Sequence, residues 1–327
     1  MKATLLHLTS ALALLALAGG CSNDLHENET NDVPGLLTFF ATVAPMAAVD
    51  ASGAMTSTPA SAATRATVEG NFPDGACIGI FVRKEGATAE KVYVYNSSTR
   101  QFTPATPADA IYWQGTPGET KSIRAWYPYP YIQLDTPTTQ PADQRSDEAF
   151  ANADFLTCKA NIVRDKPATL TFQHNSSALI TVNLSAGTGM SEAALSRATV
   201  TFPRFNTNQV EIDKNDLFMI IASGSAGVTP HKRTPAVSGD VPAFDAIVRK
   251  YNFGVNDTPE LIRVTIDGTD YSYHKPAGSS FSVSEGHHYT YNVRVNHDGL
   301  TLVPPTGGTW KPGGEPENIP STPSNNP

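Results

Sequence analysis

This sequence contains few cysteines, few charged residues and no long uninterrupted apolar run. Each of these features excludes some classes of protein. The 327 residues include 3 cysteines, so at most one disulfide bond can form within the chain. The longest apolar run, residues 3–18, is interrupted by polar residues and falls short of the roughly 20 apolar residues that a membrane-spanning helix needs. The net charge of −8 disfavours a phosphate backbone as a partner, so we expect no nucleic acid to bind.

Catalytic and metal-binding motifs are lacking as well. The sequence has no Gly-x-Ser-x-Gly elbow and no His-Glu-x-x-His. Residues 213–216 lack the later glycine and glutamate of a calcium loop, so we expect a turn there. His287 and His288 are adjacent, and on a strand they would point to opposite faces, so we expect a surface pair. The sequence therefore predicts no enzyme, no cofactor and no metal site.

The first 20 residues have the composition of a secretory signal peptide. Small residues precede Cys21, and the run Leu17-Ala18-Gly19-Gly20-Cys21 resembles a bacterial lipobox, although Ala18 stands where that pattern usually has leucine. The resemblance implies cleavage before Cys21, lipid on its thiol and anchoring in the outer membrane. An ordinary signal peptide followed by an incidental cysteine is the alternative.

Four acidic residues and no basic residue occur between residues 22 and 32. A segment of this composition cannot build a core and is expected to remain a solvated tether. An acidic run directly after a lipidated cysteine resembles the surface-export signal of Bacteroidetes lipoproteins. A plain polar spacer is the alternative.

No lysine or arginine occurs between Lys2 and Arg65. Within this stretch, residues 36–44 are apolar, β-branched and aromatic and favour a strand, whereas residues 45–64 have the composition of a loop. A protease specific for basic residues would make its first cut in the mature chain at Arg65. Because that cut would separate strand 36–44 from the rest of the fold, we assign residues 21–65 as a tether plus a removable first strand.

Short apolar or alternating runs separated by turn residues dominate the chain from Ala66 onward. Only residues 147–156 and 191–197 favour helix, the second with Ser191 as its N-cap. Strands are predicted at residues 78–82, 92–95, 122–127, 169–172, 178–184, 200–205, 209–212, 217–222, 261–266, 271–274, 289–296 and 299–303. This pattern predicts an all-β fold with long loops and little helix.

Length and composition divide this fold into two consecutive β-sandwich domains, at residues 66–168 and 169–310. Residues 164–167 form the predicted junction, and residues 223–242 form a polar loop. Residues 311–327 are rich in proline, glycine and polar residues and are predicted to be disordered.

Two cysteines remain after Cys21. Outside the cytoplasm, Cys77 and Cys158 could form a disulfide bond. Sequence spacing does not show whether their Cα atoms come within disulfide reach, so two buried thiols are the alternative.

Aromatic residues cluster at Trp126, Tyr127, Tyr129 and Tyr131. Such a cluster can form a sugar-stacking platform. It can equally cover the edge of a core, with the intervening prolines marking strand ends.

Several segments, taken in order, resemble the fimbrillin-like (Mfa-like) proteins of Bacteroidales. They are Thr64-Arg65-Ala66, residues 77–81, Trp113, residues 124–129, 154–156, 170–174 and 286–302, and Trp310. The resemblance covers most of residues 36–310. It implies two transthyretin-like β-sandwich domains, lipoprotein export and assembly into type V pili.

In that family's assembly scheme a protease removes an N-terminal strand after an arginine, and a strand of another subunit enters the exposed groove. Arg65 matches that arginine here, and Ala66 becomes the new N-terminus. The implied partners are other pilin subunits, the outer membrane through lipid on Cys21, and the processing protease.

These observations lead to the hypothesis of a structural subunit of a cell-surface fimbrium, acting as stalk, tip or anchor. Prolines make residues 311–327 a poor donor strand, so a donor would come from residues 300–303 or their neighbours. The alternative is a monomeric surface lipoprotein that binds a glycan or a host protein, with its site near the aromatic cluster.

The sequence predicts two processing events that mass spectrometry of the N-terminus on cells can detect. Lipid on Cys21 is expected because small residues precede it, and a chain beginning at Ala66 is expected after cutting at Arg65. An unmodified thiol at Cys21 in the mature chain would contradict the anchor.

Overall fold

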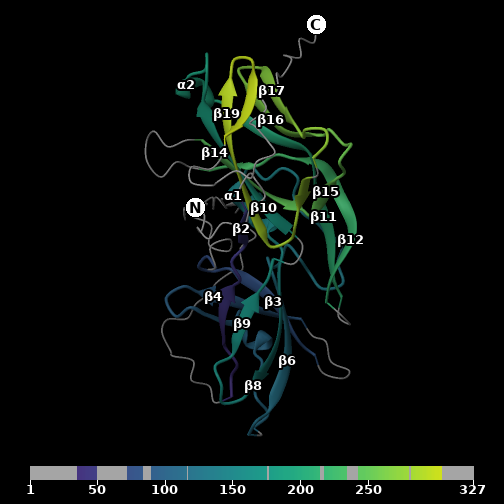
Figure 1. The fold of residues 1–327 in the computed structure, drawn as a ribbon. Coiled ribbons are helices and arrows are strands. Elements are labelled where there is room, and N and C mark those ends of the chain that lie inside the picture. The colour runs from purple at the N-terminus through teal and green to yellow at the C-terminus, as the bar shows by residue number, and fades with distance from the viewer. Residues whose placement is uncertain are drawn as a thin grey trace, which may run out of the picture.

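The computed structural model describes residues 35–49, 72–83, 90–115, 117–174, 177–213, 217–233, 242–279 and 281–303 (Figure 1). Strands make up most of these residues, as the sequence predicts. They form two bodies, called here the first half and the second half, which lie one above the other in Figure 1.

The first half is a seven-stranded sheet in the order β8-β6-β3-β4-β5-β1-β9. Its strands are β1 (Phe39–Val43), β3 (Cys77–Arg83), β4 (Lys91–Asn96), β5 (Gln101–Pro104), β6 (Thr120–Tyr127), β8 (Leu156–Val163) and β9 (Thr169–Phe172). Thr157 and Gln173 exchange two backbone hydrogen bonds, of 3.2 and 2.9 Å, which join the β8 and β9 sides. The sheet therefore closes on itself around one apolar core.

The second half is a sandwich of two sheets. One has the order β13-β14-β10-β19-β2, with β20 also paired to β19, and the other has the order β12-β11-β16-β17, with β7 paired to β11. The strands are β2 (Ala47–Val49), β7 (Thr138–Thr139), β10 (Ser177–Ala186), β11 (Thr199–Asp213), β12 (Leu217–Val228), β13 (His231–Lys232), β14 (Ala243–Arg249), β16 (Glu260–Ile266), β17 (Thr269–His274), β19 (His287–Asn296) and β20 (Gly299–Val303). A separate ribbon pairs β15 (Tyr251–Phe253) with β18 (Phe281–Val283).

Helix is confined to two short elements and one 3-10 turn (Pro107–Asp109) in the described residues. They are α1 (Asp147–Ala153) and α2 (Glu192–Leu195). Each begins after a serine whose side chain accepts a backbone N–H three residues on, which satisfies one of the unpaired N–H groups at a helix start. Both helices lie within the predicted ranges but are shorter, because α1 ends at Ala153 and β8 begins at Leu156, and the N-cap at Ser191 is confirmed.

β8 and β14 escape prediction because polar residues interrupt the apolar run of each. β14 reads Ala-Phe-Asp-Ala-Ile-Val-Arg and is buried on both faces along most of its length, so its sequence does not alternate. β8 likewise begins with three consecutive buried residues. The ribbon of β15 and β18 is also unpredicted, because each strand has only three residues.

Two of the predicted loops contain strands. The loop at 223–242 is wrong for its first part, because β12 continues to Val228 and β13 follows. Residues 222–228 are mostly small and glycine-rich, so they have little intrinsic preference for a strand. Their pairing with β11 determines their conformation instead. The loop at 45–64 contains β2.

The change of sheet occurs between β9 and β10 rather than at residues 164–167. β9 follows the predicted junction and still belongs to the first sheet. β7 precedes that junction and already pairs with β11 of the second half. The two halves therefore interlock along the chain, and an apolar cluster joins Phe81, Trp126 and Phe155 to Val210 and Ile212 of β11.

Replacing Phe39 by alanine is expected to lower the free energy of unfolding by about 3–5 kcal/mol, because a ring with no exposed surface would leave a cavity. Its neighbour Phe40 is 42% exposed, so Phe40→Ala should change that free energy by only about 0.5 kcal/mol or less. Urea denaturation followed by circular dichroism measures both variants. Equal losses would contradict the position of β1 in the core.

Candidate assembly site

The strand β1 lies in the interior of the first sheet. It pairs antiparallel with β5, with Phe39 opposite Phe102, and parallel with β9, where Phe40–Val43 lie opposite Thr169–Phe172. A strand paired on both sides supplies hydrogen bonds to two neighbours. Its removal would expose one unpaired edge on β5 and another on β9.

The side chains of this segment alternate between the core and the surface. Leu37, Phe39 and Val43 are buried, and Ala41 packs against the same core. The Phe39 ring meets the Tyr93 ring edge-on, with 5.2 Å between the ring centroids. Because successive side chains of a strand point to opposite faces, one row of the segment fills the core and the other faces outward.

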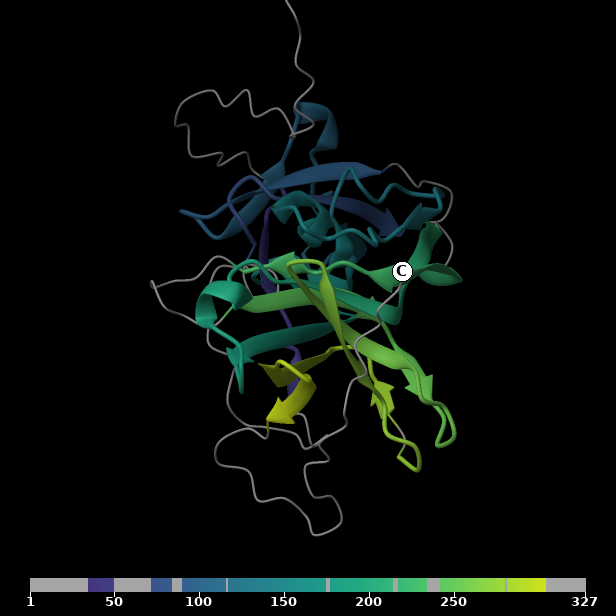
Figure 2. The same cartoon turned by 90° about the horizontal axis from the view of Figure 1, so that it is seen from above.

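The same segment continues into the second half of the molecule. The N–H of Ala44 donates to the Phe172 carbonyl and the N–H of Ala47 to the Gly286 carbonyl, each at 2.8 Å. β2 then pairs parallel with His287–Tyr289 at the start of β19. The purple segment in Figures 1 and 2 accordingly runs from the blue first half into the green and yellow second half.

β2 and β20 pair with the same edge of β19. β20 pairs antiparallel with Asn292–Asn296, just beyond the residues that pair with β2. Two segments from opposite ends of the described chain thus share one strand edge. The predicted pairing of residues 299–303 with 289–296 is confirmed, and so is the buried face of β19, formed by Tyr289, Tyr291, Val293 and Val295.

A cluster of apolar residues underlies the crossing from β1 to β2. Met46 packs against Phe150 and Ala153 of α1 and against Leu179 and Ile247 of the second half. The crossing therefore covers the place where α1 meets the second sheet.

Buried polar groups lie beside this cluster. Asp154 ends α1, and its Oδ1 lies 2.8 Å from Nδ1 of His174, which follows β9; each side chain is at most 2% exposed. Gln140 donates to the Ala153 carbonyl at 2.5 Å and to the Ser177 hydroxyl at 2.6 Å. The second oxygen of Asp154 and Nε2 of His174 are buried without a hydrogen-bond partner within the described ranges.

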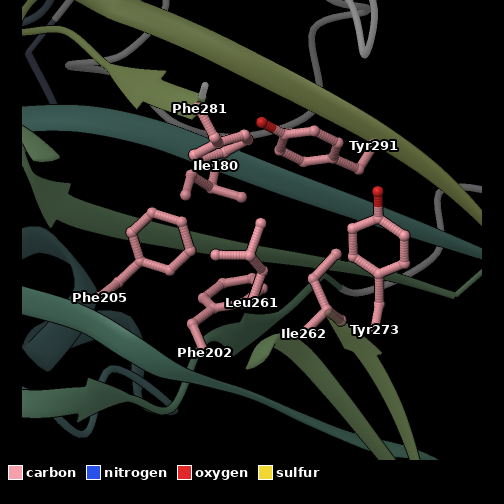
Figure 3. Close-up of a pocket in the computed structure, with 8 residues that line it drawn as sticks. All are labelled: Ile180, Phe202, Phe205, Leu261, Ile262, Tyr273, Phe281 and Tyr291. Atoms are coloured by element: carbon pink, nitrogen blue, oxygen red, sulfur yellow. The ribbon is translucent and has the colours of Figure 1, made fainter. Parts of the chain in front are cut away.

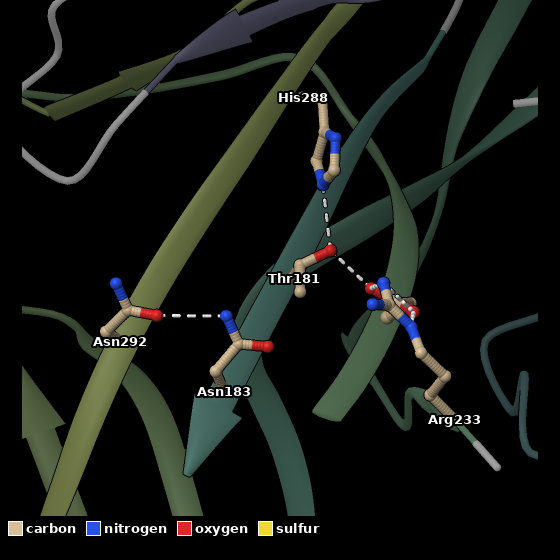
Figure 4. Close-up of polar contacts among 6 residues, drawn as sticks. Thr181, Asn183, Arg233, His288 and Asn292 are labelled. Carbon is tan, nitrogen blue, oxygen red and sulfur yellow. Dashed lines mark hydrogen bonds and ion pairs between the residues drawn. The ribbon is translucent and has the colours of Figure 1, made fainter. Parts of the chain in front are cut away.

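A second polar cluster lies on the sheet that β2 extends (Figure 4). The hydroxyl of Thr181 donates to Asp245 and lies 2.8 Å from Nε2 of His288, and Asp245 also accepts from Arg233. His288 is 7% exposed, so the predicted surface pair of histidines is wrong for His288. Because Arg233 balances the charge of Asp245, the cluster has the chemistry of a structural network.

The disulfide bond between Cys77 and Cys158, which the sequence left open, is not formed. Cys158 is a buried free thiol, and burial raises its pKa to about 11. β6 lies between the two strands that carry these cysteines. Two strand spacings amount to about 9–10 Å, beyond the roughly 7 Å limit for the Cα atoms of a disulfide.

Two of the four residues in the aromatic cluster belong to a core, and the other two are partly exposed. Trp126 and Tyr127 are buried, and the Trp126 indole N–H donates to the Ile132 carbonyl at 3.1 Å. The hydroxyl of Tyr131 donates to the Thr139 carbonyl at 2.6 Å. Because they are buried, Trp126 and Tyr127 cannot stack on a sugar.

The second core contains a small gap of about 10 Å³ (Figure 3). Apolar and aromatic side chains line it, including Phe205, Tyr273 and Tyr291. The volume falls below the roughly 300–1,000 Å³ of small-molecule sites. We therefore read it as a packing gap.

Metal-binding groups and membrane-spanning helices are both missing from the described part of the chain. The described residues contain no group of three or more histidine, cysteine, aspartate or glutamate side chains that could hold a metal ion. No helix there is long and apolar enough to cross a membrane. The predicted sites Cys21, Arg65 and Ala66 lie outside the described residues.

Comparisons with known proteins agree with this architecture. The fold resembles that of a candidate cell adhesion protein from Bacteroides uniformis, with a TM-score of 0.51 and 16% identity over 69% of this chain and 88% of that one. A candidate cell adhesion protein from Bacteroides ovatus has a TM-score of 0.50 and 15% identity over 82% and 95% of the two chains. No curated protein matches the sequence.

A family profile decides the classification. The profile described as fimbrillin-like matches residues 64–310, well over half of the 327 residues. The chain therefore belongs to the fimbrillin-like family, as the resemblance of its segments predicts.

The pair of Asp154 and His174 is not among the predicted sites, yet the sequence contains a signal for it. Leu170 and Phe172 are buried, and His174 follows at the same two-residue period. Continuing the alternation therefore places the imidazole inward. Nothing in the sequence identifies Asp154 as its partner, because the pairing depends on how α1 packs.

Replacing Asp154 by alanine is expected to cost about 3–5 kcal/mol of unfolding free energy, because the buried imidazole of His174 would lose its partner. Glu148 lies exposed on the same helix, and Glu148→Ala should shift that free energy by about 0.5 kcal/mol or less. Thermal unfolding of the two variants side by side provides the measurement. A melting temperature unchanged by Asp154→Ala would show that the pair does not stabilise the fold.

Proposed function

We propose that this protein is a structural subunit of a cell-surface fimbrium, assembled by exchanging its N-terminal segment for a strand of another subunit. The position of β1 supports this most directly. The strand that precedes Arg65 is interior to the first sheet, and its segment goes on to pair with the second half. Membership of the fimbrillin-like family supports a fimbrial or adhesive role.

The physical basis of the exchange is β-augmentation. A cut at Arg65 removes the covalent link between β1 and the rest of the fold, while the backbone pairing and the buried row remain. Burial of each of Leu37, Phe39 and Val43 contributes about 1.5–3 kcal/mol, so the cut segment stays seated until another strand displaces it. An entering strand restores the backbone bonds to β5 and β9 and refills the row.

The cell surface is the location that fits this role. Lipid on Cys21 would hold the precursor in the outer membrane, and a surface protease would then cut at Arg65. The subunit could act as stalk, tip or anchor. Its partners in each case are other pilin subunits that donate or accept a strand.

The proposal predicts that cutting at Arg65 makes the protein assemble. Purified precursor treated with an arginine-specific protease should release the segment that contains β1 and form multimers, detected by size-exclusion chromatography with light scattering. Arg65→Gln should stay monomeric. Arg204 is exposed, and Arg204→Gln should behave as the unaltered protein does.

Two results would overturn the proposal. One is equal assembly by the Arg65→Gln variant. The other is a cut precursor that remains monomeric with its segment permanently seated.

A further inference from the structure

Tyr93 of β4 contacts the removable segment from inside the core. Its side chain has no exposed surface, and its ring packs edge-on against Phe39. Burial raises the pKa of Tyr93 far above the ordinary value for a phenol. The hydroxyl therefore keeps its proton at neutral pH and always needs an acceptor.

This hydroxyl is inserted into the backbone pairing between the segment and residues 111–113. The Trp113 N–H donates to the Gly35 carbonyl at 2.8 Å and the Leu37 N–H to the Ile111 carbonyl at 2.9 Å, as in an antiparallel pair. The next bond of such a ladder would run from the Ile111 N–H to the Leu37 carbonyl. Instead, the Ile111 N–H donates to the Tyr93 hydroxyl at 3.1 Å, and that hydroxyl donates to the Leu37 carbonyl at 3.2 Å.

The bridge by Tyr93 depends on the direction of the strand. An extended strand in the orientation of β1 presents a carbonyl to the hydroxyl at the place of Leu37. A strand running the other way would present an N–H there. The hydroxyl oxygen would then receive two donors, and its own proton would be buried without an acceptor, which is costly.

We infer that Tyr93 determines the direction and the reach of the strand that replaces β1. This inference rests on the strand exchange proposed above. The partner is a strand of another subunit that runs antiparallel to β5 and extends past the place of Phe39 to offer a carbonyl at the place of Leu37. Its core-facing row is large at the places of Leu37 and Phe39, small at that of Ala41 and β-branched at that of Val43.

The test uses full-length protein with a specific protease site placed within residues 50–64, cut so that the segment stays bound without a covalent link. Two labelled peptides compete for its place: residues 35–44, and the same residues in reverse order. The reversed peptide brings the same side chains to the same places with the backbone inverted. Fluorescence anisotropy measures uptake of each.

The forward peptide should bind at least tenfold more tightly than the reversed peptide, and Tyr93→Phe should reduce that ratio severalfold. Tyr95 lies two residues along the same strand and is buried in the same core, so Tyr95→Phe should leave the ratio unchanged. An ester in place of the amide between Leu37 and Thr38 weakens the carbonyl acceptor without altering the protein. It should weaken forward binding roughly tenfold.

The outcomes separate the inference from the function on which it rests. A ratio that is the same in Tyr93→Phe as in the unaltered protein, or an ester without effect, would overturn the role of Tyr93 while strand exchange stands. Uptake of neither peptide would overturn strand exchange itself, and the inference with it.

Discussion

The double pairing of β1 is the constraint on which the rest of the structure depends. Backbone N–H and C=O groups in a core must be paired, and β1 satisfies those of β5 on one side and of β9 on the other. Because the sheet also closes where β8 meets β9, the first half has a complete circuit of strands only while this place is filled. One short segment near the N-terminus thus decides whether the sheet is closed or open.

The two halves of the molecule are linked by the same segment and by the groups beneath it. β2 extends the sheet that contains β19, Met46 covers the end of α1, and the pair of Asp154 and His174 lies where that helix meets the end of β9. Buried polar pairs are sensitive to geometry, since a lost partner leaves a charge or dipole unsatisfied. Because the same segment carries β1 and β2, its removal would break strand pairing in both halves.

The sequence predicts strands that alternate and strands that form a continuous apolar run, such as β3, but it misses strands with neither signal. β19 and its hairpin partner β20 follow from period-two patterning, whereas β14 is buried on both faces and gives no such signal. Pairing between distant segments lies beyond local patterns, so neither β9 beside β1 nor β2 beside β19 could be predicted. The bridging role of Tyr93 depends on a hydroxyl reaching a neighbouring backbone, which no spacing of residues encodes.

The parallel pairing of β1 with β9 has a consequence for biosynthesis. Thr169, the partner of Phe40, follows it by about 130 residues. At roughly 5–20 residues per second, the ribosome makes β9 several seconds to half a minute after β1. The strand β1, the first in the described part of the chain, is thus among the last to find both neighbours, and contacts this distant in sequence slow folding. Throughout that interval the nascent chain carries an apolar strand that lacks at least one of its two neighbours.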